Sequence, residues 1–111
     1  MDESIKKWLF DILQCIDEID SYFEPGNKRF DFYINDVKTR RAVERDLEII
    51  GEAVNRITKA EPNFELTNAR QIIATRNRIS HAYDSISNEM VWGILINHLP
   101  KLKSEIENML S

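Results

Sequence analysis

Residues 42–57 read AVERDLEIIGEAVNRI, and their apolar side chains recur at alternating steps of four and three residues. This spacing is typical of a helix that packs along one face against another helix. It predicts a long helix from about residue 36 to residue 60, with Asn35 as its N-cap and Asp36 at its positive end. The members of this apolar seam are Val43, Leu47, Ile50, Val54 and Ile57.

Gly51 lies in the middle of this predicted helix. A glycine inside a helix costs about 1 kcal/mol relative to alanine, so its presence needs a reason. We expect the close approach of another backbone. The adjacent Glu52 is expected to be a surface carboxylate rather than a catalytic one, because the sequence shows no partner for it.

The N-terminal part of the chain predicts one more long helix and one irregular segment. Apolar residues at helical spacing indicate a helix over about residues 2–23, which the Glu-Pro-Gly-Asn sequence at 24–27 ends. Residues 28–34 are rich in aromatic side chains, but a lone strand would have nothing to pair with. We therefore expect a loop whose aromatic rings close one end of a helical bundle.

The C-terminal half predicts two further helices, over about residues 67–83 and 88–110. Ser87 is a suitable N-cap for the last helix, and Pro100 should kink or interrupt it. With few Gly and Pro residues to make turns, the expected architecture is all-α, an up-and-down bundle of four main helices. The length of 111 residues suits one domain, covering 1–111.

Composition narrows the class of protein. The net charge is −4, which argues mildly against nucleic-acid binding, although arginines cluster locally at residues 40–45 and 70–78. The single cysteine, Cys15, cannot form a disulfide within the chain and is expected to be a packing or partly exposed thiol. The two histidines, His81 and His98, make no credible zinc set, and His98 is expected to be half-buried and hydrogen-bonded. No signal peptide or membrane span is apparent, so we expect a cytoplasmic protein with no membrane association.

Residues 76–83, RNRISHAY, combine guanidinium, amide, hydroxyl, imidazole and phenol groups in one short stretch. At about 100° per residue, Arg76 and Tyr83 fall at the edge of the core-facing stripe of the third helix. Asn77 and His81 form an i,i+4 pair on its outward face. These side chains would therefore line a surface cleft, and a second copy of the chain is a natural second wall.

The groups in this stretch suit one reaction. Histidine titrates near neutral pH, and a guanidinium binds phosphate oxygens. Without a metal set or an activated Cys or Ser, the pair fits cleavage of RNA, in which the substrate's own 2′-hydroxyl is the nucleophile. The same residue types also occur as capping and surface groups, and the helix dipole favours histidine near a C-terminus. The spacing alone favours this structural interpretation.

The stretch Arg76, four residues, His81, Ala82, Tyr83 resembles the R-x4-H-x-Y motif of the HepT-like toxins, which belong to the HEPN superfamily and to type VII toxin–antitoxin pairs. Arg76-Asn77 followed by His81 matches the broader superfamily signature. The segment 49–53, IIGEA, agrees with the same family, as do Val-Trp at 91–92 and the Leu-Pro-Lys-Leu sequence at 99–102 in the predicted last helix.

This resemblance implies a HEPN-like bundle that forms a homodimer, with the motifs of two chains lining one cleft. It implies a metal-independent ribonuclease that acts as a toxin without a cofactor. Arg76 and His81 would be catalytic, and Asn77 would assist them. The implied partner is an MntA-like nucleotidyltransferase antitoxin that adenylylates Tyr83.

Some assignments stay open at the level of the sequence. Arg78 and Arg70 would contact RNA phosphates under this resemblance, although solvated surface arginines are the simpler interpretation. The RNA target, tRNA or mRNA, is not indicated. A second hypothesis is a non-catalytic helical interaction or nucleotide-binding module that pairs with a nucleotidyltransferase.

Overall fold

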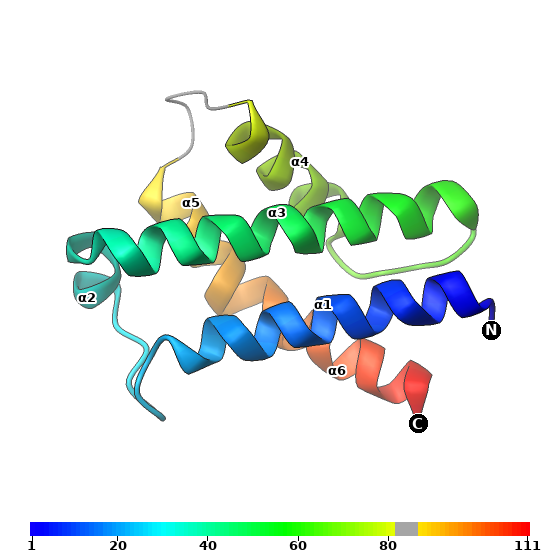
Figure 1. The fold of residues 1–111 in the computed structure, drawn as a ribbon, viewed down its shortest axis with the longest axis horizontal. Coiled ribbons are helices and arrows are strands. Elements are labelled where there is room, and N and C mark those ends of the chain that lie inside the picture. The colour runs from blue at the N-terminus through cyan, green and yellow to red at the C-terminus, as the bar shows by residue number, and fades with distance from the viewer. Residues whose placement is uncertain (82–86) are drawn as a thin grey trace.

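A computed structural model describes residues 1–81 and 87–111 of the chain. In these residues the chain is built from helices without any strand, so the predicted all-α class is confirmed (Figure 1). The elements in order are α1 (Glu3–Ser21), α2 (Phe30–Asn35), α3 (Val37–Ala60), α4 (Ala69–Ser80), α5 (Asn88–Gly93), the π-helical turn η1 (Ile94–His98) and α6 (Leu99–Leu110). None of the described helices combines the length and the apolar character that crossing a bilayer requires.

Helix α1 begins where its sequence predicts. The Asp2 carboxylate accepts hydrogen bonds from the backbone N–H groups of Ser4, at 2.8 Å, and Ile5, at 3.3 Å. These hydrogen bonds satisfy backbone N–H groups that have no acceptor within the first helical turn. The buried stripe of α1 faces α3 and α6. Its apolar members include Ile5, Leu9, Ile12, Ile16 and Ile19.

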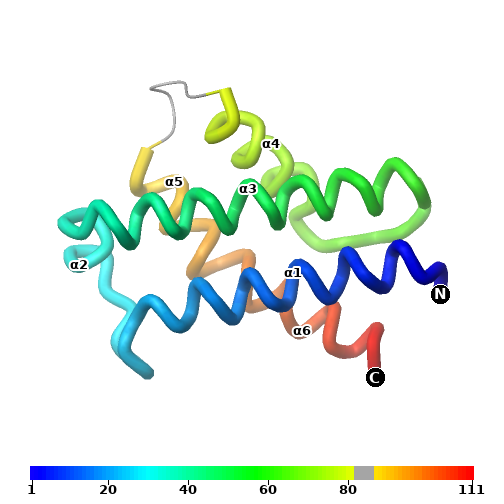
Figure 2. Tube along the Cα trace, viewed as in Figure 1, coloured from blue at the N-terminus to red at the C-terminus, as the bar shows by residue number. Residues whose placement is uncertain are grey.

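Helix α3 is the central element of the fold. It runs antiparallel to α1 and lies between α1 and α4 (Figure 1). All five residues of the predicted seam are at most 2% exposed. The prediction that this seam packs against other helices is therefore confirmed. The segment α5–η1–α6 completes the core, and the N- and C-termini lie at the same end of the molecule (Figure 2).

The expectation of a loop over residues 28–34 is wrong, because Phe30–Asn35 form the short helix α2. Tyr33 is fully buried, and its ring centroid lies 5.4 Å from that of Trp92. Phe23 and Phe30 also pack on Trp92, at 5.8 and 5.7 Å. The sequence predicted that these aromatic rings would pack at the end of the bundle. It did not predict the helix, because six residues are too few to show a helical period.

The predicted N-cap at Asn35 is also wrong. Asn35 is the last residue of α2, and its side-chain amide donates a hydrogen bond to the Asp31 carbonyl at 2.8 Å. Asp36 occupies the N-cap position of α3, and its carboxylate accepts a hydrogen bond from the Thr39 hydroxyl. Because α2 extends to Asn35, the N-cap of α3 lies one residue later than the sequence predicts, at Asp36.

The last helical segment follows its sequence signals. The Ser87 hydroxyl accepts a hydrogen bond from the Met90 N–H at 3.0 Å, so the predicted N-cap is confirmed. The regular helix is interrupted by η1, which directly precedes Leu99-Pro100. Proline has no N–H to donate to the preceding turn, and a local widening of the helix is one way to accommodate it.

A buried carboxylate, which the sequence did not reveal, joins α1 to α3. Asp46 is 3% exposed, and its Oδ2 accepts a hydrogen bond from the Tyr22 hydroxyl at 2.6 Å. Burial raises the pKa of Asp46 above the usual carboxyl range, and the nearby Glu18 adds to this shift. The folded state therefore favours the protonated form of Asp46 more than the unfolded chain does.

Replacing Asp46 with Asn tests this assignment. A raised folded-state pKa gives stability that is present at low pH and is lost as the pH rises through that pKa. We expect Asp46→Asn to unfold at higher urea than the wild type at pH 8, by about 1 kcal/mol. The difference between the two proteins should shrink toward pH 4. The exposed Glu65→Gln is the charge control, and a pH-independent difference for Asp46→Asn would contradict the assignment.

Candidate active site

Helix α4 holds the predicted catalytic residues at its C-terminal end. Ile72, 1% exposed, and the buried Thr75 turn toward the core. Helix α4 packs against α3. His81 caps its C-terminus, with the His81 backbone N–H donating to the Asn77 carbonyl at 3.1 Å. Arg76, Asn77 and His81 thus occupy the last turn and the cap of one helix.

Arg76 lies at the edge of the core, as its position in the helical pattern predicts. Its side chain is half-buried, and its stem lies directly against Gly51 of α3. A Cβ atom built on Gly51 would be 2.2 Å from Arg76 Cβ, 2.8 Å from Arg76 Cγ and 3.3 Å from the Ile72 carbonyl oxygen. The predicted reason for a mid-helix glycine is therefore confirmed, and α4 is the element that approaches it.

The polar end of Arg76 is held on the surface. Its Nη1 donates a hydrogen bond to the Asn77 side-chain oxygen at 2.9 Å. Asn77 and His81 are both exposed, as expected for the outward face of the helix. The structure therefore brings Arg76 and Asn77 into direct contact, with His81 one turn further along. Tyr83, the predicted modified residue, lies outside the described residues.

A second contact between α3 and α4 was missed at the level of the sequence. The Ser80 hydroxyl donates a hydrogen bond to Glu48 Oε2 at 3.1 Å. Glu48 and Gly51 are three residues apart on α3, and Ser80 and Arg76 are four apart on α4, so each pair shares a helix face. The position of Glu48 one turn before Gly51 was the sequence signal that could have predicted this contact. Glu52 instead pairs with Arg56 at 2.6 Å, as a surface carboxylate would.

Arg78 and Arg70, which the resemblance suggests as RNA contacts, differ in position. Both are exposed. Arg78 lies in the last turn of α4, and its Nη1 is 3.0 Å from Met90 Sδ on α5. Arg70 lies in the first turn, eight residues earlier, which is about 12 Å along the helix axis. Arg78 therefore lies at the end of α4 that carries the motif, and Arg70 does not.

The comparisons with known proteins identify the family of this chain. A family described as "Ribonuclease HepT-like" matches residues 12–109, which is most of the chain and includes all of α3 and α4. The chain belongs to the HepT-like ribonuclease family. No solved structure matches this chain.

Two archaeal relatives of this HepT-like chain cover nearly its whole length. The "Putative RNase MJ0127" of Methanocaldococcus jannaschii is 31% identical over 109 residues, which are 97% of this chain and 88% of the relative. The "Probable ribonuclease HepT" of Thermococcus cleftensis is 30% identical over 113 residues, and 98% of each chain is covered.

A group of possible metal ligands in this HepT-like chain lies away from α4. Cys15, Glu18 and Asp46 bring their ligand atoms within 4.8 Å of one another between α1 and α3. A closed structural zinc site takes four ligands, and its cysteines are thiolates. Burial, together with the nearby carboxylates, raises the pKa of Cys15 to about 12. The Tyr22 hydroxyl already bonds to Asp46, so these residues form a hydrogen-bonded cluster that fits a metal poorly.

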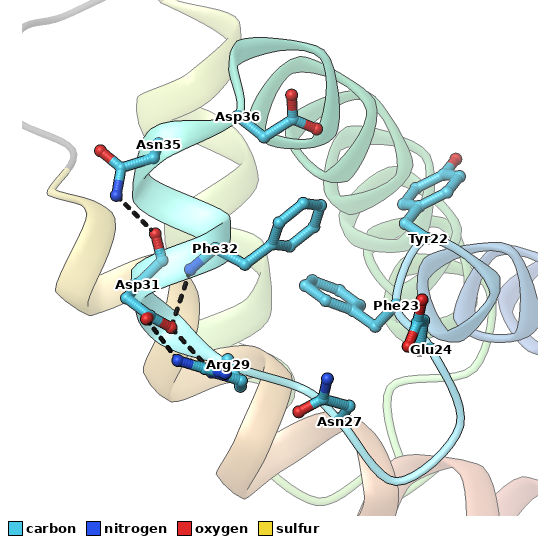
Figure 3. A pocket seen from close by; sticks show the side chains of 9 residues that line it. All are labelled: Tyr22, Phe23, Glu24, Asn27, Arg29, Asp31, Phe32, Asn35 and Asp36. Carbon is cyan, nitrogen blue, oxygen red and sulfur yellow. Dashed lines mark hydrogen bonds and ion pairs between the residues drawn. The ribbon is translucent and has the colours of Figure 1, made fainter.

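A concave surface of about 780 Å³ also lies apart from the motif, between α1 and α2 (Figure 3). The rings of Phe23 and Phe32 meet edge to face there, with their centroids 6.0 Å apart, and Phe32 is 45% exposed. Arg29 forms a bidentate pair with Asp31, so its charge is neutralised within the surface. The remaining carboxylates are those of Glu24 and Asp36. Such a surface repels phosphate, and it is not a candidate site for RNA.

His98 was expected to be half-buried and hydrogen-bonded. It is half-buried, but its buried Nδ1 has no hydrogen-bond partner within the described part of the chain. The expected burial is therefore confirmed, and the expected hydrogen bond at this nitrogen is wrong. His98 lies in η1 rather than in α4, so it is not part of the motif end.

The reactivity of Cys15 tests its assignment as a core residue. Because the thiol is 5% exposed and its pKa is raised to about 12, the thiolate should be scarce in the folded protein. We expect a thiol-reactive disulfide reagent at pH 8 to modify the folded protein at least 100-fold more slowly than the urea-unfolded chain. Comparable rates in the two states would contradict the assignment.

Proposed function

We propose that this protein is a metal-independent endoribonuclease that acts as the toxin of a toxin–antitoxin pair. The observation that carries the proposal is the arrangement at the end of α4. Arg76 is hydrogen-bonded to Asn77, and His81 caps the same helix. Membership of the HepT-like ribonuclease family supports RNA as the substrate.

The proposed reaction uses the 2′-hydroxyl of RNA as the nucleophile. His81 removes the proton from this hydroxyl, and the 2′-oxygen forms a bond to the adjacent phosphorus. The bond from phosphorus to the 5′-oxygen breaks, the leaving oxygen takes up a proton from solvent, and His81 returns its own extra proton to solvent. The products are a 2′,3′-cyclic phosphate and a free 5′-hydroxyl, so the step requires no water, metal or oxidant.

Arg76 has the geometry to stabilise the phosphorane-like charge. Its stem is fixed against Gly51, and Asn77 accepts from one of its N–H groups. The other guanidinium donors remain available to non-bridging phosphate oxygens, which a guanidinium binds in a fixed fork. Asn77 therefore assists by holding the guanidinium rather than by touching the reacting atoms.

Exposed arginines near this helix end supply the contacts to the RNA backbone. Arg78 lies beside the motif in the last turn of α4. On α3, Arg45 is exposed and lies one turn before Glu48, which bonds to Ser80. Positive charge is thus concentrated near α4 although the chain carries a net charge of −4. Arg70, at the other end of α4, would contact a longer RNA.

The homodimer and the antitoxin complete the proposal. Two copies of the α4 end would line one cleft, so each cleft receives groups from both chains. The antitoxin is a nucleotidyltransferase that transfers adenylate to the Tyr83 hydroxyl and releases pyrophosphate. The added phosphate lies two residues beyond His81, where it would occupy the phosphate position and repel RNA.

Substitution of His81 tests the catalytic assignment. His81→Ala should lower the RNA cleavage rate by about 100-fold or more, because the general base is removed, while the thermal melting point stays near that of the wild type. A chelator should leave wild-type cleavage unchanged. Arg29→Ala, an exposed arginine at the N-cap of α2, is the charge control and should cleave normally.

Two results would overturn this function. Cleavage that survives in His81→Ala would show that a different group or a contaminating nuclease acts. A clean wild-type dimer that fails to cleave any RNA would favour the non-catalytic interaction module.

The site of modification is tested by co-expression with the nucleotidyltransferase of the proposed pair. The chain has three tyrosines. Tyr33 is fully buried, and the Tyr22 hydroxyl is bonded to Asp46. We therefore expect the intact mass to rise by whole adenylate units in the wild type and in Tyr22→Phe, but not in Tyr83→Phe. An adduct that persists in Tyr83→Phe would contradict the assignment.

A further inference from the structure

We propose that Gly51 and Glu48 of α3 are positioning residues that fix the catalytic end of α4. This inference rests on the proposed ribonuclease function and extends it to residues outside the motif. Gly51 sets how closely Arg76 approaches α3. Glu48 holds the helix end that carries His81.

Gly51 acts by having no side chain. The atom that a Cβ at this position would meet first is Arg76 Cβ, at 2.2 Å. Arg76 Cβ is attached directly to the backbone, so it cannot rotate away as the end of a long side chain can. The Ile72 carbonyl, one turn earlier on α4, is also close at 3.3 Å. Any side chain at position 51 must therefore push the backbone of α4 away from α3.

Glu48 provides the second attachment, one turn away. Its carboxylate is half-buried and accepts a hydrogen bond from Ser80 at 3.1 Å. Ser80 is bonded covalently to His81, and the His81 backbone N–H is held by the Asn77 carbonyl. The position of the imidazole along the helix axis is therefore tied to α3 through Ser80.

The two attachments lie in register along the helix pair. Gly51 opposes Arg76, and Glu48 opposes Ser80, so the two helices run antiparallel at this contact. In the last turn of α4 the residues on the other side, Asn77, Arg78 and His81, are exposed. Ile72 and Thr75 are the buried residues of α4, and Ile79 in its last turn is half-buried and packs against the core. The contacts with α3 at positions 48 and 51 add to this packing and fix how the polar side of the last turn lies on α3.

The consequence for catalysis follows from geometry. A displacement of about 1 Å in a catalytic group costs on the order of 100-fold in rate, because the reacting atoms no longer align. A helix that moves away from α3 by this amount would still present its arginines to RNA. Positioning changes should therefore lower kcat far more than they weaken RNA binding.

The first test compares two helical glycines. A Cβ at Gly93 meets nothing within 4 Å, so Gly93→Ala is the matched control for Gly51→Ala. We expect Gly51→Ala to lower kcat about 100-fold. Its affinity for an uncleavable RNA with 2′-deoxy sugars should stay within about twofold of the wild type. Gly93→Ala should match the wild type in both measurements, and circular dichroism should show that both variants are folded.

The second test uses Glu48, where substitution introduces no overlap. Glu48→Gln keeps an oxygen that accepts the Ser80 hydrogen bond, whereas Glu48→Ala does not. We expect kcat to fall about 10-fold in Glu48→Ala, the scale of one lost hydrogen bond, and to be restored in Glu48→Gln. If Gly51→Ala does not fold, this pair of variants decides the proposal alone.

The outcomes separate this inference from the function on which it rests. A wild-type protein that cleaves no RNA refutes the proposed function. A wild type that cleaves, together with folded Gly51→Ala and Glu48→Ala variants of wild-type kcat, overturns the positioning role and leaves the function intact. A parallel loss of RNA affinity and kcat in these variants would also overturn the positioning role, because a general disruption of the site lowers both quantities together.

Discussion

The approach of α4 to α3 at Gly51 is the constraint on which the site depends. The glycine in the middle of α3 costs about 1 kcal/mol in helix propensity, and it lies where Arg76 Cβ and the Ile72 carbonyl of α4 come close. The apolar seam of α3 packs into the core beside this point. Helix α3, which belongs to the core, thus carries α4, whose last turn exposes the residues that we propose to be catalytic.

The sequence predicted the elements that have a repeating pattern. The seam of α3, the stripe of α1, the Ser87 cap and the meaning of Gly51 all follow from spacing within one helix. The same local reasoning placed Arg76 at the edge of the core and Asn77 and His81 on the surface, because a single helix determines their relative directions.

The features that the sequence did not reveal depend on contacts between distant segments. Helix α2 is stabilised by the packing of Tyr33 on Trp92, nearly sixty residues away. The burial of Asp46 becomes apparent only once α1 brings the Tyr22 hydroxyl to it. The bond between Ser80 and Glu48 requires the register of α4 on α3. Pattern analysis of one segment contains none of this information.

The charged side chains are unevenly distributed over the surface of the described residues. Carboxylates and aromatic rings line the concave surface between α1 and α2, whereas exposed arginines accompany the motif on α4 and the adjacent turns of α3. The acidic balance of the whole chain therefore does not describe the surface that RNA would meet. The phosphate binding that we propose at α4 would be a local property, set by Arg76, Arg78 and Arg45.

The chemistry of the cleaved ends tests the central claim most directly. Mass spectrometry of a short RNA cut by the purified protein in the presence of a chelator identifies both new termini. Attack by the 2′-hydroxyl, with His81 as the base and Arg76 on the phosphate, predicts a 2′,3′-cyclic phosphate and a 5′-hydroxyl. A 3′-hydroxyl with a 5′-phosphate would require attack by water and would contradict the account.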